Sequence, residues 1–207
     1  MVRTTKSLRK SLDALAEREA AFAKVLETLG HPEPRASSPG VETLLRTIVG
    51  QQVSVAAARS MWNKLTAKFG QPVDLKKLLK ASDEEMREAG MSRQKAGYLR
   101  SLAGLVLSGE LDLARLPGDD EEAIAQLTKI KGIGRWSAEI YLLFAEGRHD
   151  IWPAGDLAVQ IEIGKLMGFE AKPTEKQLRE LGEKWRPHRG AAAVLAWHSY
   201  NAPPLGD

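Results

Sequence analysis

The stretch LTKIKGIGRWSA, residues 127–138, decides the expected fold, because two helical segments flank a turn that carries two glycines. Glycine adopts positive φ angles and has no side chain, so Gly132 and Gly134 permit a tight turn that a phosphate can approach. The N–H groups and the dipole at the start of the following helix favour an anion, and Lys131 and Arg135 add positive charge. Gly-x-Gly alone would indicate an ordinary turn between helices. The full pattern of apolar residue, Gly-Ile-Gly-Arg and helix favours binding of the DNA backbone, without reading base sequence.

Helical periodicity extends from this stretch over nearly the whole chain, and no segment shows the alternation typical of a strand. We therefore expect an all-α protein. One helix is predicted over residues 5–29, followed by a proline-containing linker over 31–40. Further helices are predicted over about 41–49, 55–69, 83–89, 93–108, 120–127, 135–146, 157–167 and 188–201. The predicted N-cap residues are Ser54, Ser82, Ser92, Asp119 or Asp120, Asp156 and Thr174.

Composition excludes several classes of protein. The chain has no cysteine, which rules out disulfides, thiolate zinc sites and cysteine-ligated iron–sulfur clusters. No apolar run approaches the roughly 20 residues of a membrane span, and the basic start of the chain lacks the apolar segment of a secretory signal. The formal net charge is only +3, which by itself is weak evidence for a nucleic-acid partner. The histidines show no ligand spacing, so we expect no catalytic metal.

Asp156, in the segment Pro153-Ala154-Gly155-Asp156, allows two interpretations. Aspartate is a favoured N-cap, and a helical pattern follows it directly. A carboxylate fixed at a cleft can also stabilise the positive charge that develops on a sugar when an N-glycosidic bond breaks. A capping carboxylate can do both, and periodicity does not separate the two roles.

Residues 41–201 resemble the helix-hairpin-helix (HhH-GPD) DNA glycosylase superfamily, and within it the 3-methyladenine DNA glycosylase II (AlkA-like) branch. Several motifs match in order and at fitting spacings. They are the GQQVS segment at 50–54, the SRQKA segment at 92–96, the hairpin at 130–138, the WPAGD segment at 152–156, and WRPHRGA at 185–191 with Trp197. About 40 residues precede the matched region, so the chain resembles a short form that lacks the branch's N-terminal β-domain.

The resemblance implies a reaction. Asp156 matches the catalytic carboxylate. Trp136 occupies the position at which strand-cutting relatives have a Schiff-base lysine, so the chain resembles a monofunctional glycosylase that leaves an abasic site. N3- and N7-alkylated purines are cationic, stack well on indole and leave without a general acid. The expected base-pocket residues are aromatic: Trp136, Trp197, Tyr141 and Trp152.

The same resemblance implies how the partner, duplex DNA with a damaged base, is bound. The target nucleotide has to be flipped out of the duplex, and a side chain has to fill the gap. We expect Gln52 to be this wedge, with Gln51 beside it. The other expected DNA-binding residues are Ser54, Lys131, Gly132, Gly134, Arg135 and Ser137. The hairpin of the family often holds Na⁺ or K⁺, here through the backbone carbonyls of Thr128, Ile130 and Ile133.

We expect two helical lobes with a central cleft. Residues 41–118 would form one lobe and residues 119–207 the other, with the N-terminal helix of residues 1–40 packed on the second. We expect a monomer that needs no cofactor, acts in the cytoplasm on nucleoid or nuclear DNA and has no membrane partner. Three alternatives stay open: a non-catalytic helix-hairpin-helix module, a glycosylase-lyase for other damaged bases, and a purely structural helical protein.

Overall fold

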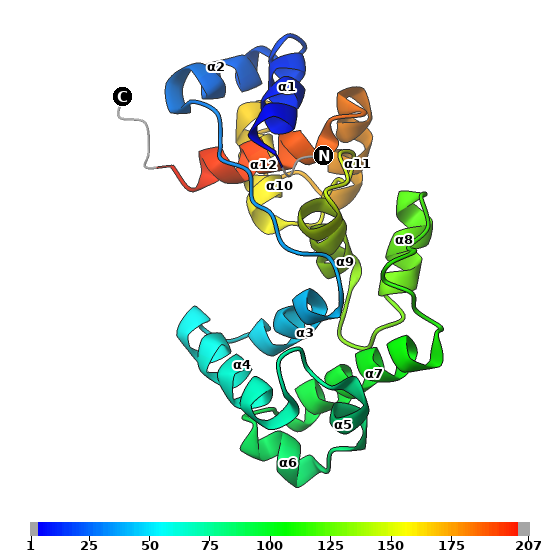
Figure 1. Ribbon diagram of the computed structural model, residues 1–207. Helices are drawn as coiled ribbons and strands as arrows, with labels where there is room; N and C mark the ends of the chain where they lie inside the picture. Colours follow the sequence, from blue (N-terminus) through cyan, green and yellow to red (C-terminus); the bar gives the residue numbers. More distant parts are fainter. Residues whose placement is uncertain (1–3, 203–207) are drawn as a thin grey trace. The chain divides into compact units, whose positions relative to one another are not determined.

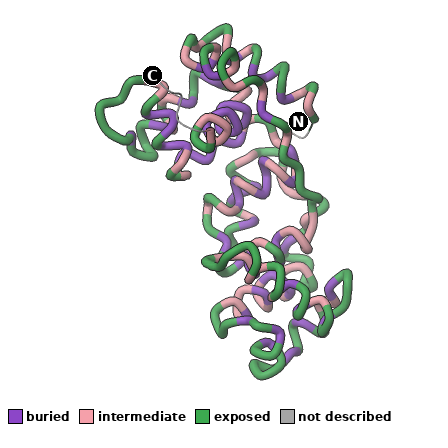
Figure 2. The backbone as a smooth tube through the Cα atoms, turned by 90° about the vertical axis from the view of Figure 1, so that its left-hand side faces the viewer, coloured by how far each residue is buried: buried purple, intermediate pink, exposed green. Residues whose placement is uncertain are grey.

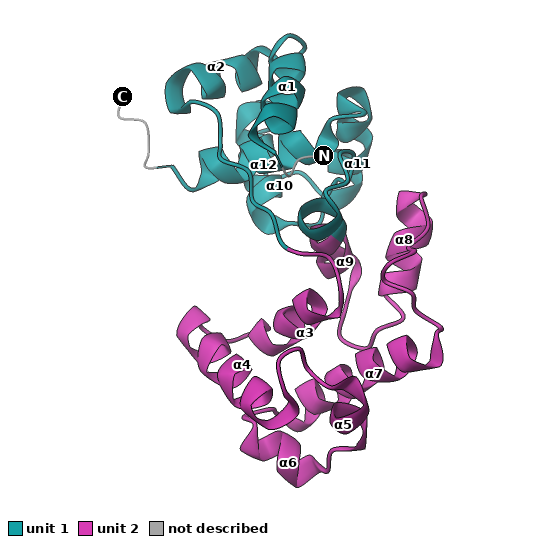
Figure 3. Cartoon of the chain, viewed as in Figure 1, with its two compact units in different colours: residues 1–37, 142–207 teal, residues 38–141 magenta. Residues whose placement is uncertain are grey.

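The computed structural model describes residues 4–202, and these residues form helices joined by turns, with no strand among them (Figure 1). The all-α prediction is therefore confirmed for the described chain. The chain divides into two compact units (Figure 3): unit 1 comprises residues 1–37 and 142–207, and unit 2 comprises residues 38–141. Within residues 4–202 no helix is both long enough and apolar enough to cross a membrane.

This division differs from the expected boundary at residue 118. Residues 119–141, which include the hairpin, belong to unit 2 and not to the unit that contains Asp156. The reason is local hydrogen bonding. The Lys131 N–H donates to the Ser101 hydroxyl, and the Gln51 side-chain amide donates to the Gly132 carbonyl, which attaches the hairpin to the preceding helices.

Unit 1 contains the two ends of the described chain (Figure 1). Its elements are α1 (Thr5–Ala16), α2 (Ala20–Leu29), the π-helix η1 (Leu142–Glu146), α10 (Leu157–Leu166), α11 (Glu175–Gly182), the 3-10 helix η2 (Glu183–Trp185) and α12 (Arg189–Tyr200). Residues 190–196 of α12 are buried, and α1, α2 and α10 pack around this helix. The N-terminal helices and the C-terminal segment thus share one core.

The single helix predicted over residues 5–29 is wrong, because α1 and α2 are separate helices with a break at residues 17–19. The break has a physical reason. Glu19 adopts extended backbone angles, and its carboxylate accepts the Trp185 indole N–H at 3.1 Å and pairs with Lys184. Trp185 is fully buried, and its ring packs against Phe22 and Trp152. The break therefore joins the N-terminal helices to the aromatic core.

Unit 2 consists of α3 (Val41–Gly50), α4 (Val55–Phe69), α5 (Leu75–Lys80), α6 (Asp83–Glu88), α7 (Arg93–Ser108), α8 (Asp120–Leu127) and α9 (Arg135–Tyr141). Helix α7 packs against α3, α5 and α6 and buries Ala96, Leu99, Leu102 and Ala103. Figure 2 shows buried positions alternating with exposed ones along the chain. The predicted N-caps are confirmed, with Asp119 rather than Asp120 capping α8. The helix predicted over 135–146 is α-helical only to Tyr141 and continues as the π-helix η1.

Candidate functional site

The two hairpin glycines differ in what the structure requires of them. Gly132 has φ +84°, and a Cβ there would lie 2.2 Å from the ring of Tyr98. Both the backbone angle and the close approach of Tyr98 require glycine at this position. Gly134 has no positive φ, and a Cβ added to it would meet no atom within 4 Å. The folded chain therefore gives no steric reason for the second glycine, whose backbone is exposed to solvent at the start of α9.

Helix α7 contacts the hairpin turn and holds it in place. The Lys131 N–H donates to the Ser101 hydroxyl at 3.1 Å, and Tyr98 packs against Gly132. The Gln94 side-chain amide in turn donates to the Tyr98 hydroxyl. Three α7 side chains at helical spacing thus fix the turn, and the exposed Lys131 side chain is left to project from it.

The loop that follows α3 lies against the same turn. Its Gln51 side-chain amide donates to the Gly132 carbonyl at 2.8 Å. Gln52 is exposed and has φ +54°, the one positive φ of a non-glycine residue in the described chain. Lys95 reaches across from α7 and donates to the Val49 carbonyl at 2.6 Å, and burial lowers the pKa of this lysine. Ser54 ends the loop by capping α4.

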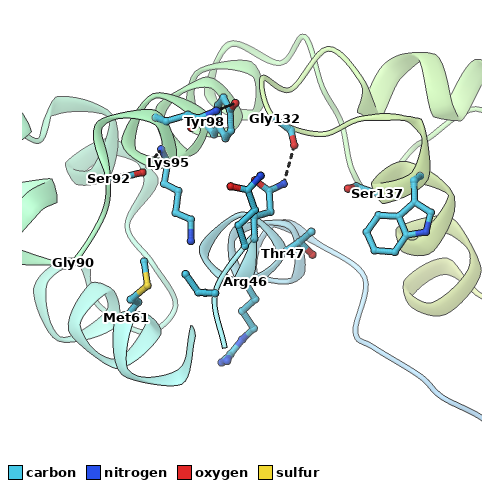
Figure 4. A pocket seen from close by; sticks show the side chains of 15 residues that line it. Arg46, Thr47, Met61, Gly90, Ser92, Lys95, Tyr98, Gly132 and Ser137 are labelled. Atoms are coloured by element: carbon cyan, nitrogen blue, oxygen red, sulfur yellow. Dashed lines mark hydrogen bonds between the residues drawn. The ribbon is translucent and has the colours of Figure 1, made fainter. Parts of the chain in front are cut away.

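These elements line a groove of about 1000 Å³ in unit 2 (Figure 4). The figure shows Gly132 with its hydrogen bond to the loop, Tyr98 near it, and Ser137 on α9. Of the ten residues of this unit that are expected to touch DNA or the base, five line the groove: Gln51, Gln52, Gly132, Trp136 and Ser137. Trp136 is 49% exposed. The structure therefore brings together residues that are distant in the sequence.

Arg135 is held inside the hairpin by two carboxylates. Its terminal nitrogens donate to Glu121 of α8, one of them at 2.8 Å, and its Nε donates to Glu139 at 3.0 Å. The hydrogen bonds to Glu121 raise the pKa of the guanidinium above its ordinary value, against the lowering effect of burial. The positive charge of Arg135 is thus largely offset by Glu121 and the buried Glu139.

In unit 1, Asp156 is the N-cap of α10, and the capping prediction is confirmed. Its Oδ1 accepts the Val159 N–H at 3.0 Å and the Trp197 indole N–H at 3.0 Å. Trp197 comes from α12, so two helices fix the same carboxylate oxygen. The Trp197 ring packs at 5.6 Å against Phe144 of the π-helix and lines a cavity of about 230 Å³. The carboxylate is half-buried and rigidly oriented.

Two of the expected pocket residues, Trp152 and Tyr141, are buried in the protein. Trp152 is buried, donates its indole N–H to the Leu178 carbonyl and contacts Trp185, so its ring belongs to the core of unit 1. Tyr141 is also buried, and its hydroxyl accepts the Gly40 N–H at 2.8 Å. That these rings line a base pocket stays a prediction. Trp136 and Trp197 retain partly exposed rings.

The expected cation ligands lie in the turn between α8 and α9. The Ile130 carbonyl accepts the Ile133 N–H at 3.0 Å, and a carbonyl oxygen has a second lone pair for a further ligand. Among residues 4–202 no group of three or more histidine, aspartate or glutamate side chains is placed to hold a metal ion.

Three residues that contact the hairpin and hold it in place are not predictable from the sequence pattern. Tyr98, Ser101 and Glu121 touch the hairpin, but each comes from a helix whose pattern shows only amphipathicity. Lys95 lies within the SRQKA segment, but the sequence alone predicts no contact for it. The unexplained polar residues of the SRQKA segment were the available signal.

Comparison with known proteins gives a consistent result. Residues 45–188 match the family model of the HhH-GPD superfamily of base excision DNA repair proteins. DNA-3-methyladenine glycosylase 1 of Schizosaccharomyces pombe is 30% identical over 97% of this chain and 90% of its own. The solved structure of S. pombe 3-methyladenine DNA glycosylase in complex with abasic DNA has a TM-score of 0.80 and 27% identity, covering 96% of this chain and 100% of that chain. A DNA-3-methyladenine glycosidase structure from Bacillus halodurans has a TM-score of 0.83 and 28% identity, covering 96% and 91%.

The two hairpin glycines provide a matched test of stability. We expect Gly132→Ala to lower the free energy of unfolding by at least about 2 kcal/mol, because it adds left-handed backbone strain and a collision with Tyr98. Gly134→Ala should change it by less than about 0.5 kcal/mol. Urea denaturation of the two variants measures both values. Equal destabilisation by the two substitutions would contradict this account of the turn.

Proposed function

This chain belongs to the HhH-GPD superfamily of base excision DNA repair proteins, and we propose that it is a monofunctional DNA glycosylase that hydrolyses the N-glycosidic bond of alkylated purines in duplex DNA. The observation that carries the proposal is the Asp156 carboxylate, whose Oδ1 is fixed by the Val159 and Trp197 N–H groups at the start of α10. One solved relative is bound to abasic DNA, which is the product this reaction leaves.

The chemistry follows from the charge of the substrate. A purine methylated at N3 or N7 carries a positive charge, so it departs as a neutral base when the bond between sugar C1′ and the base nitrogen breaks and the base keeps the electron pair. The sugar is left with the positive charge, which the Asp156 carboxylate stabilises electrostatically. Water then adds to C1′ and loses a proton, which yields the abasic site. No general acid is needed for the leaving base.

Trp136 explains why the reaction would stop at the abasic site. Strand cleavage by a glycosylase-lyase requires an amine that attacks the sugar and forms a Schiff base. An indole has no such nucleophile. Trp136 of unit 2 is 49% exposed and Trp197 of unit 1 is partly exposed, and the indole of either residue is suited to stack on a cationic base. Within unit 1, the indole N–H of Trp197 has the additional task of orienting Asp156.

Unit 2 would hold the DNA. The backbone at Gly134 is exposed and unobstructed at the start of α9, as close approach of a phosphate to N–H groups requires. Lys131 adds an exposed charge. Gln52, exposed and in a left-handed conformation, is the wedge that fills the gap left by the flipped nucleotide. The carbonyls of Thr128, Ile130 and Ile133 offer the hard oxygen ligands that suit Na⁺ or K⁺, which would fix the turn when bound.

The same proposal includes the partner and its setting. The protein would bind duplex DNA containing a damaged base as a monomer, in the nucleoid or nucleus where such DNA is found. The exposed aromatic rings and the Asp156 carboxylate favour an alkylated base as the substrate. The protein would need no cofactor for this hydrolysis.

Substitution of Asp156 by asparagine tests the catalytic role. Asparagine caps a helix as well as aspartate does, so stability and DNA affinity should stay within about 0.5 kcal/mol of those of the wild type. We expect single-turnover release of 7-methylguanine from duplex DNA to fall by at least about 100-fold, because the charge that stabilises the sugar cation is lost. Chromatography of the released base measures the rate. Equal release by both proteins would remove Asp156 from the mechanism, and release by neither would favour a non-catalytic DNA-binding module.

The salt dependence of binding separates two basic residues of the hairpin. Lys131→Ala should reduce the slope of log Kd against log salt concentration by about 1, because an exposed phosphate contact is lost. Arg135→Ala should leave the slope unchanged, because Glu121 and Glu139 already offset its charge. Fluorescence anisotropy with an undamaged duplex at several salt concentrations measures both slopes. A reduced slope for Arg135→Ala would show that this guanidinium binds a phosphate.

A further inference from the structure

The two consecutive glutamines at the end of α3 are used in different ways. The Gln51 side chain turns to the hairpin and donates its amide N–H to the Gly132 carbonyl at 2.8 Å, across a sequence separation of 81 residues. Gln51 is partly buried, whereas Gln52 is exposed. Figure 4 shows this hydrogen bond as a dashed line at Gly132, among the residues that line the groove. The Gln51 amide is thus engaged within the protein, and Gln52 is the one that faces solvent.

The acceptor of this hydrogen bond is itself held in place. Gly132 has φ +84° and lies against the Tyr98 ring, where no side chain could be added. The Gln94 amide fixes the Tyr98 hydroxyl, and Ser101 accepts the N–H of the adjacent Lys131. Helix α7 therefore sets the position of the Gly132 carbonyl, and Gln51 is bonded to a rigid part of the hairpin.

The loop that carries the donor Gln51 is also held at both ends. Lys95, also on α7, donates to the Val49 carbonyl at 2.6 Å and so ties the last turn of α3 to the same helix. Beyond Gln52, the Ser54 hydroxyl accepts the Ala57 N–H and begins α4. The left-handed backbone of Gln52, with φ +54°, lies between these two anchors. A non-glycine residue stays in this conformation only where its neighbours hold it there.

We propose that Gln51 is a positioning residue, which holds the Gln52 wedge at a fixed place relative to the DNA-binding hairpin. The inference rests on the proposed function and adds a role for Gln51 that differs from DNA contact. When the hairpin binds the DNA backbone, the Gln51–Gly132 hydrogen bond fixes the position of Gln52 relative to the hairpin, and therefore relative to the stacked bases. Because the wedge is already ordered, inserting it requires no further ordering of the loop.

Two substitutions of Gln51 break the hydrogen bond in different ways. Gln51→Leu removes the hydrogen-bond donor but keeps a side chain of similar size. Gln51→Glu replaces the donating nitrogen with an oxygen that faces the Gly132 carbonyl. Gln52→Ala, which removes the wedge itself, is the matched control. All are made in the Asp156→Asn background, so that flipping is measured at equilibrium without base release. The probe is a duplex with one 7-methylguanine next to 2-aminopurine, whose fluorescence rises when its neighbour leaves the stack.

We expect both Gln51 substitutions to reduce the fluorescence rise at saturation by at least about 5-fold, as Gln52→Ala does. Affinity for an undamaged duplex and the thermal midpoint should stay close to those of the parent, because Tyr98 and Ser101 of α7 still support the hairpin in each variant. The double variant Gln51→Leu/Gln52→Ala should be no worse than Gln52→Ala alone, because Gln51 acts through Gln52.

Additive losses in the double variant would show that Gln51 contacts DNA independently and would overturn the proposal. A full fluorescence rise with Gln51→Leu would do the same. Loss of undamaged-duplex binding together with a lower thermal midpoint would show a structural role only and would also overturn it. The proposed glycosylase function is tested independently of Gln51: it fails if the protein with wild-type Asp156 releases no methylated base.

Discussion

The proposed chemistry of this protein depends on one carboxylate oxygen that two helices hold in place. Oδ1 of Asp156 accepts the Val159 N–H at the start of α10 and the indole N–H of Trp197 from α12. Helix α12 is itself fixed by burial of residues 190–196 and by the close approach of Gly190 to the His149 carbonyl, to which its N–H donates. A charge held this rigidly needs no reorganisation when positive charge develops beside it, which is the condition for electrostatic catalysis.

The second unit of the chain supplies a different property, a preformed surface for the DNA backbone. Helix α7 carries Lys95, Tyr98 and Ser101, which contact the end of α3, the hairpin glycine and the hairpin backbone. One helix thus sets the positions of the two segments that the proposed function assigns to DNA. The two hairpin glycines serve different purposes. The fold requires Gly132 because Tyr98 lies against it, whereas Gly134 has no steric role in the fold and leaves its backbone open to a ligand.

Much of the candidate site could be predicted from the sequence, because its residues lie in local motifs. The hairpin, the capping residues and Asp156 depend on short-range patterns that glycine and N-cap preferences reveal. The break between α1 and α2 was missed because the apolar period continues through it, and only the contact of Glu19 with Trp185 explains it. Trp152 was assigned to a pocket by resemblance, and its core position depends on packing with Trp185 that no local pattern encodes. The pairing of Arg135 with Glu121 and of Gln51 with Gly132 was missed for the same reason.

The central claim, removal of a base without strand cleavage, is tested most directly by analysing the products from a duplex that carries one 7-methylguanine. We expect one free base for each alkali-labile site, a strand that stays intact until alkali is added, and no covalent protein–DNA adduct after borohydride treatment. A strand broken before alkali, or an adduct trapped by borohydride, would contradict the claim.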